Sequence, residues 1–154
     1  MIHKKSTTQT SESLPLGILL ALSGGLMDAY SYVCRGKVFA NAQTGNILLF
    51  AVNLSEKNMM TAMHYLFPVL AFTAGIALAA SVRYFFKEAR KLHWRQTSVM
   101  FEIVLLFLVS LLPQSRNLLA NCLTSFVCGI QVETFRKIEG TALATTMCIG
   151  NLRT

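Results

Sequence analysis

The segment Met63–Phe86 reads MHYLFPVLAFTAGIALAASVRYFF, and its one charged side chain, Arg83, lies near its end. These 24 residues would form a helix about 36 Å long, at about 1.5 Å per residue. A helix that crosses a bilayer needs about 20 predominantly apolar residues. The segment is therefore long and apolar enough to cross a membrane.

Other apolar segments occupy most of the remaining chain. They are Leu14–Cys34, Val38–Leu54, Thr97–Pro113 and Asn117–Phe135, with a sixth that begins at Gly140. Only 14% of the 154 residues are charged, whereas soluble domains contain about 25%. Soluble helices of this length would also show a charged face. The sequence predicts an all-α, polytopic transmembrane helix bundle at residues 14–154, after a polar N-terminal tail at residues 1–13.

The net charge of +7 raises the possibility of a nucleic-acid partner. Five of the basic residues, however, share one short loop: Arg83, Lys87, Arg90, Lys91 and Arg95. That pattern is typical of a cytoplasmic loop that faces anionic lipid. We therefore expect the lipid bilayer, with anionic lipid at loop 83–95, as the partner, and no nucleic acid. If all six segments cross, nine basic residues lie on one side and five on the other, which places the N-terminus outside.

The chain contains no sequence pattern of a catalytic or metal site. Its four cysteines lie inside or at the ends of apolar segments and form no CxxC pair: Cys34, Cys122, Cys128 and Cys148. A buried cysteine behaves as a small hydrophobic residue. We expect no enzyme activity, no metal and no cofactor.

The sequence resembles itself when it is shifted by 105 residues. The matched pairs are Gly24/Gly129, Asp28/Glu133, Tyr30/Phe135, Val33/Ile138, Gly45/Gly150 and Asn46/Asn151. Internal repeats are common in transporters. The basic pairs after Asp28 and Glu133, together with an even number of intervening segments, predict a parallel repeat. If Val38–Leu54 instead dips into the membrane and returns, the number becomes odd and the repeat is inverted.

The repeat also predicts unit boundaries. The first unit covers about residues 14–113, and the second begins near residue 117 and is incomplete at residue 154. We therefore expect the chain to be C-terminally truncated, without a final helix pair. An oligomer is possible.

Acidic residues inside apolar segments are candidate binding residues. An ionised carboxylate at that depth costs about 2.5–3.5 kcal/mol and usually faces a cavity or the bundle interior. Asp28 therefore binds a proton, a cation or a substrate, or else it is neutral, bonded to a neighbouring helix or paired with Arg35. Glu133 is a weaker candidate because Arg136 follows it closely. For Glu102 we expect an ion pair at the membrane boundary.

The motif NAQTGN at residues 41–46 places amides and a helix breaker between apolar segments. Thr44, Gly45 and Asn46 form either half of a binding site, with Gly150 and Asn151 as the other half, or a set of interhelical hydrogen bonds. Small residues predict close helix packing elsewhere. They are Gly24, Gly25, Ala71, Gly75 and Ala79.

The segment GGLMDAYSYVCRGKVFANAQTGNILLFA resembles the YoaK-type family of bacterial inner-membrane proteins. Two family motifs match at the following positions: Gly25, Asp28, Ala29, Ser31 and Tyr32, then Gly36, Val38, Phe39, Ala40, Thr44, Gly45 and Asn46. In the second half, Ile149 occupies the position where the family usually has Thr. The resemblance implies a multi-pass bacterial inner-membrane protein whose function is unassigned.

Two functions remain open from the sequence. The first is a secondary transporter or permease-like protein for a small solute, in which the candidate residues line a shared site. The second is a structural or regulatory membrane protein in which the same polar groups only hold helices together. Exposure of Asp28 to water would distinguish the two functions.

Overall fold

The computed structural model describes residues 13–85, 94–138 and 141–142. These residues form α1 (Leu14–Cys34), α2 (Gln43–Ser55), α3 (Met59–Phe85), α4 (Trp94–Ser110), the 3-10 helix η2 (Gln114–Arg116), α5 (Asn117–Thr134), and the strands β1 (Lys137–Ile138) and β2 (Thr141–Ala142). The two short strands pair antiparallel. Apart from this pair of two-residue strands, every described element is a helix, so the expected helical class is confirmed. The sixth expected segment lies mostly outside the described residues.

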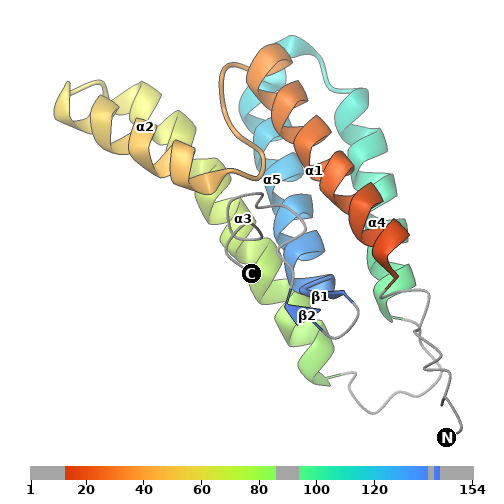
Figure 1. The fold of residues 1–154 in the computed structure, drawn as a ribbon. Helices are drawn as coiled ribbons and strands as arrows, with labels where there is room; N and C mark the ends of the chain where they lie inside the picture. The colour runs from red at the N-terminus through yellow and green to blue at the C-terminus, as the bar shows by residue number, and fades with distance from the viewer. Residues whose placement is uncertain (1–12, 86–93, 139–140, 143–154) are drawn as a thin grey trace, which may run out of the picture.

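Helix α5 lies at the centre of the bundle (Figure 1). Ten of its 18 residues are buried, and it contacts α1, α3 and α4. Helix α2 instead leans away from the bundle and packs against α3 (Figure 1). The side chains of α5 therefore make up a large part of the buried interior.

Helices α1 and α5 run antiparallel. The Gln131 side-chain amide donates to the Leu20 carbonyl at 3.1 Å, and the Cys128 thiol approaches the Met27 sulfur at 3.7 Å. Near the other end, the Asn121 side-chain amide donates to the carbonyl of Arg35 at 2.8 Å. Residue numbers thus rise on one helix as they fall on the other. These are the helices that the 105-residue shift matches, so the expected parallel repeat is wrong in direction.

The reason is that α2 does not cross the bundle. Its 13 residues span about 20 Å, less than the roughly 30 Å of a bilayer core. The preceding residues 35–42, which we call the return loop, run back beside α1 (Figure 1). The N-cap residue Ala42 lies level with Asp28, whose carboxylate accepts its N–H at 3.3 Å. Helix α2 begins at that depth, so the expected crossing by Val38–Leu54 is also wrong.

Helices α3 and α5 cross in direct backbone contact. A Cβ atom on Gly75 would lie 2.2 Å from the carbonyl oxygen of Phe126, and one on Gly129 would lie 2.2 Å from that of Phe72. The contact is symmetrical because both helices carry the pattern Phe-x-x-Gly-Ile, at residues 72–76 and 126–130. Small residues at such a crossing let helix backbones approach closely.

The other predicted packing residues have different surroundings. Ala79 and Gly24 are buried, and Ala71 is half-buried. Gly25 is exposed, and a Cβ atom added there would meet no atom within 4 Å. Gly25 is therefore not at a close helix contact among the described residues.

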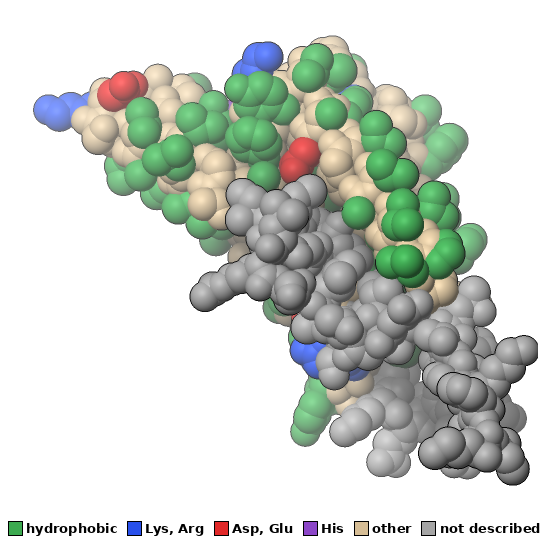
Figure 2. Space-filling view, in the orientation of Figure 1, with side chains coloured by type: hydrophobic (Ala, Val, Ile, Leu, Met, Phe, Trp, Pro, Cys, Tyr) green, Lys and Arg blue, Asp and Glu red, His purple; other side chains and the backbone are tan. Residues whose placement is uncertain are grey.

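The outside of the bundle is strongly apolar (Figure 2). Leu26 is 71% exposed, Val33 70% and Leu48 63%. Two described helices, α1 and α3, are long and apolar enough to span a membrane. Soluble monomers rarely expose contiguous apolar surface on this scale.

Candidate functional site

The return loop is held by two side chains of α1. One carboxylate oxygen of Asp28 accepts the N–H groups of Asn41 at 2.7 Å and Ala42 at 3.3 Å. The Ser31 hydroxyl accepts the N–H of Ala40 at 3.0 Å and donates to the Asp28 carbonyl at 3.1 Å. Non-helical backbone at membrane depth needs such partners, because no bulk water replaces them. Asp28 therefore holds the last two residues of the return loop, immediately before α2.

The motif at residues 41–46 completes this arrangement. The Asn46 side chain accepts the N–H of Phe39 at 3.0 Å and donates to its carbonyl at 2.7 Å, as a neighbouring strand would. It also donates to the Gln43 side chain at 2.8 Å, and Gln43 donates to the Ala40 carbonyl at 2.8 Å. A Cβ atom on Gly45 would lie 2.8 Å from the Phe39 ring. Asn46 and Gln43 therefore stabilise the return loop that precedes them.

Thr44 differs from its neighbours because its side chain is exposed. The structure thus brings Asp28, Gly45 and Asn46 together around the return loop and leaves Thr44 at the surface. Gly150 and Asn151, the expected second half of the site, lie outside the described residues.

Replacing Asn46 with alanine tests the loop contacts. The change removes three hydrogen bonds and leaves the half-buried Phe39 backbone groups without these partners, so we expect a loss of about 1–3 kcal/mol in stability. The control is Asn53→Ala, since Asn53 bonds only the Leu49 carbonyl of its own helix. Thermal unfolding in detergent should show little change for the control. Equal midpoints for the two variants would contradict the assignment.

Arg35 joins three helices at the other end of the return loop. Its side chain is buried, with 3% of the residue exposed. Its Nε donates to the Tyr30 hydroxyl at 2.6 Å, and its two terminal nitrogens donate to oxygens at the end of α4 and the start of α5. Those acceptors are the carbonyls of Val109, Leu112 and Pro113 and the Asn117 side chain.

This arrangement places the Arg35 guanidinium at the C-terminal end of α4. The last carbonyls of a helix have no partner within it and carry partial negative charge. Arg35 supplies the missing donors to α4, so its charge is balanced without a carboxylate. Asp28 and Arg35 therefore have separate partners. The alternative considered from the sequence, an ion pair between Asp28 and Arg35, does not form.

A buried polar face runs along the central helix. Its members are Asn121, Thr124, Ser125, Gln131 and Thr134, all at most 1% exposed. Gln131 and Asn121 reach carbonyls of α1. Among the described residues, the Oδ1 of Asn121 and the Oγ1 of Thr134 have no hydrogen-bond partner. Sequence reasoning missed this face, although its polar residues recur at helical spacing in Asn117–Phe135.

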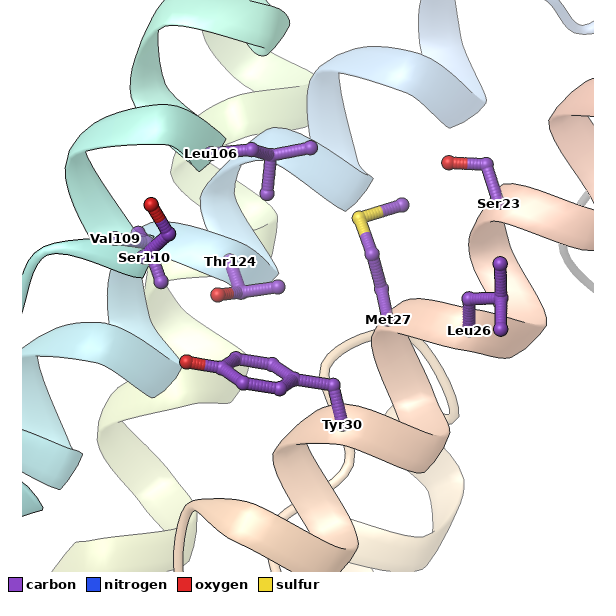
Figure 3. A pocket seen from close by; sticks show the side chains of 8 residues that line it. All are labelled: Ser23, Leu26, Met27, Tyr30, Leu106, Val109, Ser110 and Thr124. Atoms are coloured by element: carbon purple, nitrogen blue, oxygen red, sulfur yellow. The ribbon is translucent and has the colours of Figure 1, made fainter.

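A cavity of about 320 Å³ opens between α1, α4 and α5, and Thr124 is the member of the polar face that lines it (Figure 3). We call it the α1–α4–α5 cavity. Its lining is Ser23, Leu26, Met27, Tyr30, Leu106, Val109, Ser110 and Thr124. The four hydroxyl groups among these residues can bind water or a small polar solute in a space of this size.

The two remaining acidic candidates have opposite surroundings. Glu133, at the end of α5, pairs with Arg83 at 2.8 Å and Arg136 at 3.8 Å. Glu102 lies in the middle of α4 and is only 6% exposed. Its Oε1 is buried and has no hydrogen-bond partner among the described residues. The expectation that Glu102 lies at the membrane boundary is therefore wrong, because α4 begins at Trp94 and carries it into the bundle.

A family model described as "Protein of unknown function (DUF1275)" matches residues 16–154. The chain belongs to the DUF1275 family. It is 25% identical over 141 residues to the "UPF0700 transmembrane protein YoaK" of Bacillus subtilis (strain 168), and the match covers 87% of this chain and 61% of that protein. The resemblance to YoaK-type proteins is thus confirmed. No solved structure matches the chain.

This DUF1275 chain is therefore a membrane protein from a family whose function is unassigned. The apolar exterior and the two span-length helices agree with that class. The described residues 13–85, 94–138 and 141–142 contain no group of three or more metal-ligating side chains.

Proposed function

We propose that this chain is a multi-pass protein of the bacterial inner membrane and a secondary transporter, or permease-like protein, for a small solute. The observation that carries the proposal is the buried polar face of α5 beside the α1–α4–α5 cavity. Buried polar side chains inside a membrane bundle are costly, and they usually mark a path or a binding site.

The arrangement of helix ends supports a definite orientation. The start of α1, the end of α3, the start of α4 and the end of α5 lie at one end of the bundle, which we call the basic end (Figure 1). Nine basic residues lie in or beside the segments attached there: Lys4, Lys5, Arg83, Lys87, Arg90, Lys91, Arg95, Arg136 and Lys137. The opposite end has four: Arg35, Lys37, Lys57 and Arg116. The basic end, and with it the N-terminus, is then cytoplasmic.

This orientation reverses the one expected from the sequence. The reversal follows from the return loop and α2, which together bring the chain back to the end of the bundle where α1 ends. The start of α1, the end of α3 and the start of α4 therefore share one end (Figure 1). The tail's lysines then agree with the positive-inside rule. Anionic lipid at the basic loop remains part of the proposal, and residues 86–93 lie outside the described residues.

The antiparallel course of α1 and α5 also supports an inverted repeat. Inverted repeats with discontinuous helices are a common transporter design, in which the helix break lies near the substrate site. The return loop and the short helix α2 are such a break in the first unit. The repeat itself remains a proposal.

The second candidate function is a structural or regulatory membrane protein. The observation in its favour is that Asp28 and Asn46 bond the return loop. On this alternative, the other buried polar groups serve the same purpose, as hydrogen bonds worth about 0.6–2 kcal/mol each between helices.

Thiol labelling separates the two functions. In a version of the chain without its native cysteines, single cysteines replace Ser23 or Thr124, which line the α1–α4–α5 cavity. Thr73, exposed on the lipid-facing side of α3, is the matched control. A charged thiol reagent should modify the two cavity positions in membranes and spare Thr73. A small solute that slows the reaction would be a candidate substrate.

Failure of both cavity positions to react, while a cysteine at the exposed Ser115 reacts, would support the structural alternative. Equal reaction at Thr73 and the cavity positions would show only that the reagent reaches the whole surface, and would count against a defined cavity.

A further inference from the structure

Glu102 is a buried acid that takes part neither in the contacts of the return loop nor in the ion pairs described above. It lies one helical turn after Ser98 and one turn before Leu106 on α4. The neighbouring Leu105 and Leu106 pack against a core cluster that contains Met27, Phe72 and Cys128. The carboxyl group is therefore placed among apolar side chains at the middle of the bundle.

The other described acids inside or beside the bundle have hydrogen-bond or ion-pair partners that offset the loss of water around the carboxylate. Asp28 accepts two backbone N–H groups, and Glu133 has two arginines. Arg35 cannot serve Glu102, because its guanidinium already donates to five oxygens. A carboxylate without donors at such a site is strongly disfavoured relative to the neutral acid.

Glu102 also lies between two hollow regions. Ser98 lines a cavity of about 230 Å³ between α3, α4 and α5, whose other lining residues are mostly apolar. Leu106 lines the α1–α4–α5 cavity, which carries the hydroxyls of Ser23, Tyr30, Ser110 and Thr124. Residues four apart lie on the same face of a helix, about 5–6 Å from each other. Water in the hydroxylated cavity would therefore lie about one turn from the acid.

We propose that Glu102 is a proton-binding site, held as a neutral carboxylic acid that exchanges its proton with water in the α1–α4–α5 cavity. In the forward step the carboxyl O–H bond breaks and the proton passes to a water molecule, which leaves a carboxylate and a hydronium ion. The reverse step restores the acid. The inference deepens the proposed function, on which it rests for the role of the proton as coupling ion.

Few other titratable groups face this acid from the elements packed around it. On α5 the group is the Cys128 thiol, which belongs to the core cluster against which Leu105 and Leu106 of α4 pack. On α1 the groups are Asp28 and Tyr30, and Tyr30 is bonded to Arg35. On α4 itself, Arg95 lies two turns earlier and has its own partner.

Infrared spectroscopy of the membrane-embedded protein tests the proposal. The wild-type protein should show the carbonyl band of a protonated carboxylic acid, and the band should shift when the sample is moved into D₂O. Glu102→Gln, which preserves size, should remove the band. Glu133→Gln is the matched control and should leave it in place, because Glu133 is paired with arginine.

A second measurement needs no variant. Dicyclohexylcarbodiimide, an apolar reagent, modifies carboxyl groups only in their protonated form. Peptide mapping of the treated wild-type protein should locate the modification at Glu102, with a yield that falls as the pH is raised.

Persistence of the acid band in Glu102→Gln, its absence from the wild type, or carbodiimide modification only at other acids would each overturn the proposal. A band that belongs to Glu102 but does not shift in D₂O would show a static acid, and would overturn proton exchange. Thiol labelling of Ser23 and Thr124 is independent of these results. A labelled cavity with a negative infrared result would reject the proton site and retain the transporter.

Discussion

Replacing Arg35 with leucine is expected to destabilise the native bundle strongly, with a loss of stability of about 3–5 kcal/mol or more. The change removes five donors from buried or partly buried oxygens, and each acceptor left without a partner costs about 1–3 kcal/mol. It also loosens the end of α1 from α4 and α5, because among the described residues the only other side-chain hydrogen bond that joins these helices at this end is the one from Asn121 to the Arg35 carbonyl.

Arg35→Lys provides a finer test of the same contact. Lysine keeps the positive charge but has three donors on one atom, whereas arginine presents five in a planar fork. We expect Arg35→Lys to be destabilised by less than Arg35→Leu but still measurably, because several carbonyls of α4 lose their donors. The unfolded fraction during a titration with a denaturing detergent reports both effects.

The control is Arg116→Leu, which changes an exposed arginine at the same end of the bundle. This variant should unfold near the wild-type midpoint, since exposed substitutions usually change stability by about 0.5 kcal/mol or less. A wild-type midpoint for Arg35→Leu would show that the helix ends are held by packing alone. Full stability in Arg35→Lys would show that charge, and not the fork geometry, is what α4 requires.

Gly129→Ala is expected to give the second large effect. The new methyl group would lie 2.2 Å from the carbonyl oxygen of Phe72, which is backbone and cannot move aside as a side chain can. Helices α3 and α5 must separate along their closest contact. We expect a loss of more than about 1–3 kcal/mol, the usual range for overpacking a core.

Two further variants make this prediction specific. Gly75→Ala places its methyl 2.2 Å from the Phe126 carbonyl and should cost about as much as Gly129→Ala. The double variant should cost less than the sum, because one separation of the helices relieves both clashes. Gly25→Ala is the matched control. It meets no atom within 4 Å and should be neutral or stabilising by about 0.5–1 kcal/mol, since alanine favours helix more than glycine does.

Thermal unfolding of the four glycine variants in one detergent gives the comparison. Similar midpoints for Gly129→Ala and Gly25→Ala would mean that the α3–α5 crossing is looser than its geometry indicates. Strict additivity in the double variant would mean that the two contacts are independent, contrary to the symmetry of the crossing.

Much of the fold could be predicted from local properties of the sequence. The boundaries of α1 and the start of α5 followed from where apolar residues begin and end, because the bilayer requires length and hydrophobicity that a sequence displays directly. The family could be predicted for a similar reason, since its two motifs occupy one uninterrupted stretch around Asp28 and Asn46.

The course of residues 38–54 could not be predicted in the same way. The apolar segment is of nearly spanning length, and only its partners show that its first part is a loop. Asn46 bonds Phe39, and Asp28 bonds the N-cap of α2. The number of crossings, the direction of α1 relative to α5 and the orientation all depend on that one segment. The error there therefore reversed the expected direction of α1 relative to α5, and the orientation that we propose follows from the same segment.

The sequence by itself determined that this chain is helical, apolar and a member of a membrane-protein family, because those properties are sums over neighbouring residues. Tertiary structure alone decided what each polar group does. Asp28, the prominent acid in the sequence, caps a loop, whereas Glu102, assigned from sequence to the boundary, is buried with an oxygen that has no partner among the described residues. A side chain's role in a low-dielectric interior depends on the donors within about 3 Å of it, and residues distant in the sequence supply most of these donors.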